Sequence, residues 1–315
     1  MESISARFQE NALEAIGNTP LVKLNELTKG LNANVYLKLE YYNPTGSMKD
    51  RMALSMIEGA ERDGSLKKKG DTVIEYTGGS TGSSLAFVCA VKGYKLQIVT
   101  SDAFSKEKLD TMRAFGAELT IVPSENGRIT PDLIPKMMKI VEERGKESGA
   151  YRTNQFYNRY QLLGYNEMGR EILKQLGDQV DSFVMAFGTA GCSMGVAQVL
   201  KAKNRNIKVV LVEPVEAPLV SKGLSGIHHI EGIGVGFIPP HLSKELYDEI
   251  LSVSTAEAQE MARRLAREEG IFSGTSTGAN VVASLEVARR MGEGKNIVTV
   301  AVDSGLKYLS TELYK

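Results

Sequence analysis

The sequence lacks several features that mark common functional classes. Its 38 Lys and Arg residues balance its 38 Asp and Glu residues, so the formal net charge is zero. This balance gives no electrostatic basis for binding nucleic acid or an anionic membrane. No apolar run approaches the roughly 20 residues that span a bilayer, and the first seven residues lack the apolar core of a secretory signal. We therefore expect a cytoplasmic protein with no nucleic-acid or membrane partner.

Cysteine and histidine are also scarce. Cys89 and Cys192 are the only two cysteines, which is too few for a disulfide framework. His228, His229 and His241 lack the helical spacing of metal ligands, so we do not expect a zinc enzyme. The absence of a Gly-x-Gly-x-x-Gly fingerprint argues against a nicotinamide-dependent oxidoreductase.

What the sequence does contain is a long alternation of short β-branched runs and helical patterns. With 315 residues and 42% hydrophobic content, the chain is long enough for one large or two medium domains. Such alternation predicts an α/β fold with parallel sheets covered by helices on both faces. The count of strands and helices restarts near Gly149, which predicts a change of domain there. The predicted strands are 35–40, 72–75, 95–100, 118–122, 182–186, 208–212 and 296–301, and predicted helices include 105–115, 131–144 and 255–269.

Ligands of open α/β sheets bind beyond the carboxyl ends of the strands, so the strand-to-helix loop around Lys49 is informative. Pro44 and Gly46 break the preceding strand, and Ser47 is predicted to cap the next helix. Lys49 then lies in the first helical turn, where the helix dipole and partial burial disfavour an ammonium. A partly neutral lysine can form a Schiff base with a carbonyl compound. A solvated first turn is the alternative interpretation.

Two further strand-to-helix loops and one polar turn before a late helix carry glycines and hydroxyl groups. The N–H groups and hydroxyls of loop 77–84 suit a carboxylate, and those of loop 188–195 suit a phosphate. The turn 270–278 could present Ser276 to a ligand. The alternative interpretations are packing glycines for the first two loops and an ordinary N-cap for Ser276.

In this order, the motifs resemble the cysteine synthase and cystathionine β-synthase family of fold type II pyridoxal-phosphate enzymes. The resemblance implies two open-sheet α/β domains with the cofactor in the cleft between them. Residues 1–40 and 150–315 would form the larger domain, which anchors the cofactor, and residues 41–149 a smaller mobile domain with the substrate loop. The matching segments are 16–21, 43–51, 77–82, 154–156, 188–192, 231–234, Ser276 and 303–305.

The resemblance also assigns roles to individual residues. Lys49 would hold pyridoxal 5'-phosphate covalently and act as a general base. Ser276 would face the pyridine nitrogen, and Gly232 would lie near the cofactor and the substrate amine. The cofactor phosphate would be bound by Gly188, Thr189, Ala190, Gly191 and Cys192. The substrate carboxylate would be received by Thr77, Gly78, Gly79, Ser80, Thr81 and Gln155, with Ser80 also next to the cofactor.

The chain departs from the family pattern at several of these positions. Ser80 replaces an asparagine that normally contacts the ring hydroxyl of the cofactor. Ala190 and Cys192 stand where glycine and threonine are usual, and the run 156–160 differs from the usual Asn-Pro-Ala-Asn ending. These changes bear on the substrate more than on the cofactor.

The function that the resemblance implies is β-replacement on an activated serine. The first expectation is cysteine synthesis from O-acetylserine or O-phosphoserine and sulfide. One alternative is cystathionine formation or elimination from cysteine, and another is a non-catalytic family member that acts as a binding or sensor protein. We also expect a homodimer, since symmetric dimers are the commonest oligomers.

Overall fold

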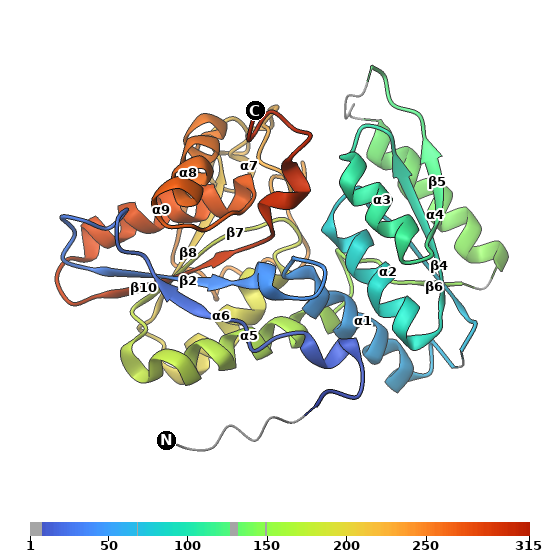
Figure 1. Ribbon diagram of the computed structural model, residues 1–315, viewed down its shortest axis with the longest axis horizontal. Helices are drawn as coiled ribbons and strands as arrows, with labels where there is room; N and C mark the ends of the chain where they lie inside the picture. Colours follow the sequence, from blue (N-terminus) through green and yellow to red (C-terminus); the bar gives the residue numbers. More distant parts are fainter. Residues whose placement is uncertain (1–7, 68, 127–131, 149) are drawn as a thin grey trace.

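Two lobes, each built on one sheet, make up the computed structural model, which describes residues 8–67, 69–126, 132–148 and 150–315 (Figure 1). The larger sheet has six strands in the order β1-β2-β10-β7-β8-β9, and only β1 is antiparallel to its neighbour. Its strands are β1 (Leu21–Lys23), β2 (Asn34–Leu39), β7 (Ser182–Ala186), β8 (Lys208–Pro214), β9 (Glu249–Val253) and β10 (Asn296–Ala301).

The smaller sheet has four parallel strands in the order β5-β4-β3-β6. They are β3 (Thr72–Tyr76), β4 (Lys95–Ser101), β5 (Glu118–Val122) and β6 (Tyr151–Arg152). Every strand predicted above is observed, which confirms the α/β fold. The chain leaves the smaller sheet only after Arg152, because β6 still pairs with β3 beyond the expected domain change near Gly149.

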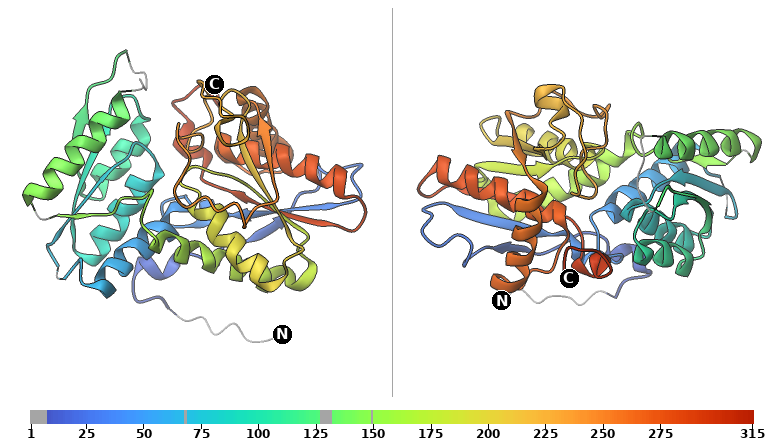
Figure 2. Two further views of the ribbon diagram at one scale, coloured as in Figure 1. Left: turned by 180° about the vertical axis from the view of Figure 1, so that it is seen from behind. Right: turned by 90° about the horizontal axis from the view of Figure 1, so that it is seen from above.

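The larger sheet is buried on both faces, as its continuous apolar strands require. Along β7, Phe183 and Met185 belong to the apolar cluster shared with α5 (Tyr160–Leu176) and α6 (Gly191–Lys203). The intervening Val184 and Ala186 belong to the cluster shared with α8 (Thr255–Glu268) and α9 (Thr275–Met291). The two helix pairs therefore cover opposite faces of the sheet, as Figures 1 and 2 show.

Apart from the short α7 of the larger lobe, the remaining α-helices belong to the smaller lobe or join the two lobes. The helix α1 packs against α2 of the smaller lobe and α5 of the larger lobe. The predicted helices 105–115, 131–144 and 255–269 correspond to α3, α4 and α8, although residue 131 lies outside the described residues. The bounds are α1 (Lys49–Asp63), α2 (Ser80–Lys92), α3 (Lys106–Ala114), α4 (Leu133–Ser148) and α7 (Leu219–Lys222), with short 3-10 turns at Ala12–Ala15, Glu40–Tyr42, Gly177–Gln179 and Gly305–Tyr308.

A buried ionic network fixes the first turn of α1. The Arg51 guanidinium donates to Glu40 Oε2 at 2.7 Å and Oε1 at 2.8 Å, and to Glu171 Oε1 at 2.7 Å. Lys38 lies 2.7 Å from the other oxygen of Glu171. Burial alone would raise the pKa of Glu171, but Arg51 and Lys38 lower it to about 2. The helix that begins at Lys49 is thereby held to the 3-10 turn after β2 and to α5.

Candidate active site

Lys49 is the first residue of α1, as the sequence predicts, but the capping prediction is wrong. The N-cap is Met48 rather than Ser47, and it makes no side-chain capping bond. Ser47 forms an isolated antiparallel bridge with Asp303, which keeps it outside the helix, and the Met48 N–H donates to Val302 O at 2.9 Å. The Ser47 hydroxyl still accepts from the Lys49 N–H at 3.2 Å. The segment that follows β10 therefore positions Lys49.

The Lys49 amine faces conditions that favour its neutral form. Burial lowers the pKa of Lys49, and the nearby Cys192 and Asp303 offset only part of this effect. Burial also raises the pKa of the Cys192 thiol to about 12, although the charge of Lys49 opposes this. Cys192 is therefore a neutral thiol next to Lys49, and the lysine is not a solvated first-turn residue.

The predicted substrate loop follows β3 and leads into α2, which starts at Ser80 with Gly79 as its N-cap. A Cβ atom at Gly78 would lie 2.0 Å from the Phe104 ring, so this glycine is required by packing. A Cβ atom at Gly79 would meet nothing within 4 Å, which leaves backbone space at this position for a ligand. The Thr77 hydroxyl accepts from the Gly79 N–H at 3.1 Å.

Gln155 meets this loop from a different part of the chain. Its Oε1 accepts from the Thr81 hydroxyl at 2.9 Å, and its Nε2 donates to Tyr76 O at 3.3 Å. The buried carboxyl of Glu75 accepts from the Gln155 N–H at 3.0 Å and from the Thr153 hydroxyl at 2.6 Å. Burial raises the pKa of Glu75, and these donors partly offset the rise. The structure thus brings together Thr81 and Gln155, two residues predicted to bind the substrate carboxylate.

The predicted phosphate loop follows β7 and opens α6. Ala190 has a φ of +61°, and α6 begins directly after it at Gly191. A Cβ atom at Gly188 would lie only 2.3 Å from Gly232 O, so the loop is in close contact with the Gly232 segment. The first N–H groups of an α-helix have no acceptor within the helix. This set of N–H donors suits a phosphate dianion and fits the phosphate of pyridoxal 5'-phosphate.

Ser276 lies buried in the first turn of α9, whose N-cap is Gly274, so the N-cap interpretation of Ser276 is wrong. The Gly274 N–H donates to Asp303 O at 3.3 Å, and the Thr277 hydroxyl accepts from Val302 N–H at 3.0 Å. The segment that holds Lys49 therefore also holds the helix that carries Ser276.

Asp303 is a site residue for which the sequence suggests no role. Its Oδ2 accepts from the Tyr308 hydroxyl at 2.8 Å and from the Ser80 hydroxyl at 3.3 Å. Among the described residues, its buried Oδ1 has no hydrogen-bond partner. Burial raises the pKa of Asp303, although Lys108 and Lys307 partly offset the rise.

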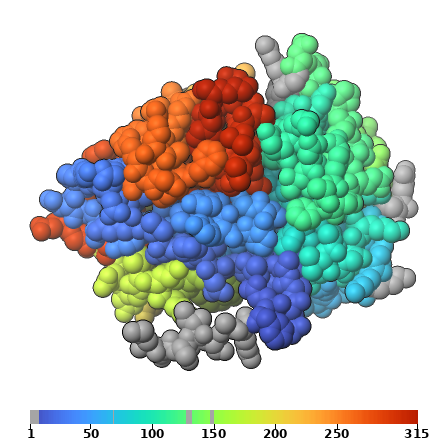
Figure 3. All heavy atoms as spheres, in the orientation of Figure 1, coloured from blue at the N-terminus to red at the C-terminus, as the bar shows by residue number. Residues whose placement is uncertain are grey.

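A second set of contacts joins the lobes beside Asp303. Lys108 of α3 is buried and pairs with Glu231, while its Nζ lies 4.6 Å from the centre of the Tyr308 ring. The Ser310 hydroxyl donates to Glu107 at 2.7 Å. Figure 3 shows the C-terminal segment in red lying directly against the smaller lobe. Each of these contacts joins residues more than 100 positions apart, so local sequence patterns do not predict them.

Three loops match the Gly-x-Ser-x-Gly spacing of a hydrolase nucleophile, at 78–82, 191–195 and 274–278. The Ser193 hydroxyl donates to Ala190 O at 3.1 Å, and the Ser80 hydroxyl donates to Asp303. Within the described parts of the chain, no histidine side chain bonds to the serine of any of these loops. The arrangement needed to activate a serine nucleophile is therefore missing there.

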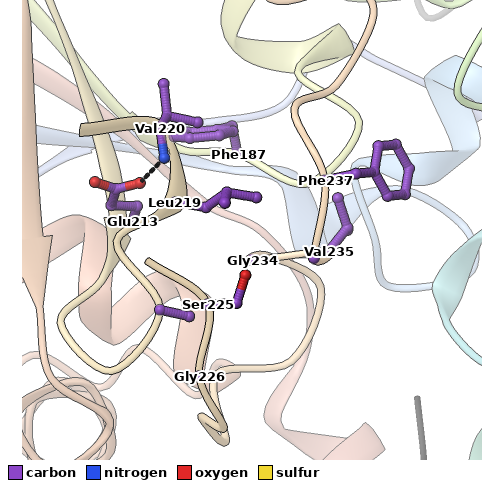
Figure 4. Close-up of a pocket in the computed structure, with 11 residues that line it drawn as sticks. Phe187, Glu213, Leu219, Val220, Ser225, Gly226, Gly234, Val235 and Phe237 are labelled. Carbon is purple, nitrogen blue, oxygen red and sulfur yellow. Dashed lines mark hydrogen bonds between the residues drawn. The ribbon is translucent and has the colours of Figure 1, made fainter. Parts of the chain in front are cut away.

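A small pocket lies in the larger lobe (Figure 4). Phe187, Leu219, Val235 and Phe237 give it a mostly apolar lining. The carboxylate of Glu213 accepts a hydrogen bond from the Val220 N–H at 3.0 Å, so it is bonded to the backbone of the segment that lines the pocket. Phe187 directly precedes Gly188, and Gly234 follows Gly232 by two residues, so the pocket borders two of the predicted cofactor-binding segments.

Over the described ranges, no group of three or more His, Cys, Asp or Glu side chains could hold a metal ion. Within the same ranges, no helix combines the length and apolar character that crossing a membrane requires. Cys89 and Cys192 are both buried free thiols.

Comparison with known proteins agrees with this geometry. A family model described as pyridoxal-phosphate dependent enzyme matches residues 12–303, and the chain belongs to this family. It is 43% identical over 307 residues to a cysteine synthase of Staphylococcus aureus (strain Mu50 / ATCC 700699), which covers 97% of each chain. The family confirms the resemblance inferred from the motifs and gives pyridoxal 5'-phosphate as the cofactor.

Two solved structures extend the comparison. Cysteine synthase from Entamoeba histolytica is 37% identical with a TM-score of 0.93, covering 100% of this chain and 93% of that one. A hydrogen sulfide-producing enzyme from Fusobacterium nucleatum is 41% identical with a TM-score of 0.88, covering 96% of this chain and 100% of that one. These similarities confirm the two-sheet α/β fold.

Proposed function

We propose that this enzyme catalyses β-replacement on an activated serine, with cysteine synthesis from O-acetylserine, or O-phosphoserine, and sulfide as its main reaction. The observation that carries the proposal is that Lys49 lies near Asp303 and near Cys192 of the predicted phosphate loop, with its pKa lowered by burial. The 43% identity to a cysteine synthase over 97% of the chain supports the choice of reaction.

In this proposal, one loop holds the phosphate of the cofactor and another loop receives the carboxylate of the substrate. The N–H groups of the phosphate loop, from Gly188 to Cys192, bind the phosphate, while Ser276 faces the pyridine nitrogen. The substrate carboxylate binds the N–H groups and hydroxyls of loop 77–81 together with Gln155. Gly232 contributes backbone space beside the substrate amine.

Lys49 supplies the proton transfers. Pyridoxal 5'-phosphate, when bound, supplies the electron sink that lets a leaving group depart from the β-carbon. The Lys49 Nζ, once released from the cofactor, accepts the α-proton of the amino acid and returns it after the nucleophile has added. A lysine with a lowered pKa suits this task because its neutral form is the base. The neutral Cys192 thiol adds no negative charge near the phosphate.

A second candidate reaction on the same site is elimination from cysteine, which releases sulfide. The 41% identity to the hydrogen sulfide-producing enzyme from Fusobacterium nucleatum favours this candidate. The two reactions share Lys49 and the loops, and they differ in which molecule leaves from or adds to the β-carbon.

Product analysis separates the candidates. Purified enzyme is incubated with O-acetylserine, O-phosphoserine, serine or cysteine, each with and without sulfide or homocysteine. The main proposal expects the fastest turnover to be cysteine formation from O-acetylserine, or O-phosphoserine, and sulfide. Faster sulfide release from cysteine alone would reverse the order of the two candidates, and turnover of no amino acid would overturn both.

We further propose that the enzyme acts as a cytoplasmic homodimer. Symmetric dimers are the commonest assemblies of such proteins, and the balanced charge gives no reason to expect a nucleic-acid partner. Light scattering should give twice the 34.3 kDa chain mass at micromolar concentration, whereas a mass of one chain would contradict the dimer.

A further inference from the structure

We infer that Gln161 is a positioning residue that fixes the substrate loop and the phosphate loop relative to each other. The inference rests on the site assigned under the proposed function. Gln161 is fully buried and is the second residue of α5, outside every loop assigned to the site. It follows directly the run 156–160, where the sequence departs from the family pattern.

The two ends of the Gln161 amide reach different parts of the site. Its Nε2 donates to the backbone oxygen of Gln155, and its Oε1 accepts from the Thr189 hydroxyl at 2.8 Å. The same amide also packs tightly against the phosphate loop. A Cβ atom at Gly191 would lie 2.0 Å from Gln161 Oε1.

The hydrogen-bond network determines which end of the amide faces which partner. The Gln155 carbonyl can only accept a hydrogen bond, so the NH₂ group of Gln161 must face it. The oxygen of the amide then faces the Thr189 hydroxyl, which donates its single proton. A side chain that lacks either the donor or the acceptor cannot serve both loops.

These bonds complete a continuous path between the two predicted binding loops. The Thr81 hydroxyl bonds to the side chain of Gln155 at 2.9 Å, and Gln155 bonds through its backbone to Gln161. Gln161 in turn bonds to Thr189, whose hydroxyl accepts from the Gly191 N–H at 3.2 Å. Gln161 therefore orients a substrate-carboxylate ligand on one side and a phosphate ligand on the other.

Loss of the Gln161 amide should weaken both binding events together. The Gln155 carbonyl would be left buried without this donor, and the Thr189 hydroxyl would lose its acceptor. Losing hydrogen bonds at a buried site changes an equilibrium by about tenfold. We expect Gln161→Leu to raise both the Kd for pyridoxal 5'-phosphate and the KM for the amino acid by about tenfold, with a smaller effect on kcat.

The first experiment compares Gln161→Leu with Gln175→Leu. Gln175 lies in the last turn of the same helix, and its side chain bonds, within the described parts of the chain, to Lys38 and Thr19 O, both at 3.0 Å. Cofactor-free protein is titrated with pyridoxal 5'-phosphate, and KM and kcat are measured with the substrate that the wild type uses fastest. The control should keep the Kd and KM within about twofold of wild type. A lower melting temperature with unchanged Kd and KM in Gln161→Leu would reduce Gln161 to a structural role.

A second variant, Gln161→Glu, adds a pH-dependent readout. A protonated carboxyl can donate to Gln155 O and accept from Thr189, as the amide does, whereas a carboxylate cannot donate. Burial beside these groups raises the pKa of a carboxyl. The ratio of the Gln161→Glu Kd to the wild-type Kd should therefore be near one at low pH and rise as the pH increases.

This second readout keeps the test decisive if Gln161→Leu fails to fold. A ratio for Gln161→Glu that stays flat from pH 5 to pH 9 would overturn the positioning role. A wild-type protein that binds no pyridoxal 5'-phosphate would instead overturn the site assignment itself. The two failures are therefore distinguishable.

Discussion

The Ser80 hydroxyl donates to Asp303 Oδ2 at 3.3 Å, a contact that links the first residue of α2 to the segment holding Lys49. These residues are 223 positions apart and come from different lobes. An asparagine at position 80 would have a longer side chain than serine and would add an amide group at this contact. Position 80 therefore lies at a contact between the two lobes.

The first prediction concerns this position. If the main reaction is cysteine synthesis, Ser80→Asn should raise kcat/KM with O-acetylserine by severalfold, because an added hydrogen bond contributes about 0.5–1.5 kcal/mol. If the site is instead adapted to a bulkier substrate, the asparagine fills its space and kcat/KM falls. Ser80→Ala is the matched control, since it removes the hydroxyl without adding an amide and should not raise kcat/KM. No change in kcat/KM for either variant with any amino acid would show that Ser80 lies outside the site.

The second prediction concerns Gly191. A Cβ atom there would lie 2.0 Å from Gln161 Oε1, so Gly191→Ala should displace Gln161 and raise the Kd for pyridoxal 5'-phosphate by at least about tenfold. Gly145→Ala on α4 is the control, because its nearest neighbour would be an ordinary contact at 3.9 Å. Equal cofactor affinity in Gly191→Ala and wild type would contradict the close packing of the phosphate loop.

The third prediction concerns Glu171 in the ionic network that fixes the first turn of α1. Arg51 and Lys38 lower the pKa of Glu171 to about 2, despite the opposing effect of burial. The ionised Glu171 carboxylate therefore stabilises the fold at pH values above its unfolded pKa of about 4.3. This contribution is lost as the pH falls toward 2. Glu171→Gln should therefore lower the free energy of unfolding by about 3 kcal/mol at pH 7, with the difference shrinking below about pH 4.5.

Urea unfolding measured across this pH range tests the third prediction. Glu167→Gln provides the control, because Glu167 lies on the same helix and pairs with Arg170 in solvent, where an ion pair contributes about 0–1 kcal/mol. A penalty for Glu171→Gln that is the same at pH 3 and pH 7 would show that the charge of Glu171 is not its source.

The sequence predicts the sheets and the loops because both depend on local patterns. Runs such as 183–186 are apolar throughout, as is typical of strands buried on both faces. Glycine-rich turns directly after such strands then indicate ligand loops at the carboxyl edge of the sheet. The short β6, with only two residues, has too little pattern to be predicted. The prediction that Ser47 caps α1 also fails, because Ser47 pairs with the distant Asp303 and lies outside the helix.

The parts of the site that the sequence does not reveal depend on contacts between distant segments. Gln161 reaches Gly191 because the start of α5 passes the phosphate loop, and no spacing in the sequence encodes that approach. Asp303 meets Ser80 only when both lobes are assembled. The one signal that could have pointed to Gln161 is the unusual run 156–160 immediately before it.

The central claim is that Lys49 is the lysine that carries the cofactor. Holoenzyme is reduced with borohydride, digested, and analysed by mass spectrometry to locate the pyridoxyl-modified lysine. The account predicts modification of Lys49, and loss of both the modified peptide and the visible cofactor absorbance in Lys49→Ala. Modification of another buried lysine near the cleft, such as Lys108 or Lys307, in the wild-type protein would contradict it.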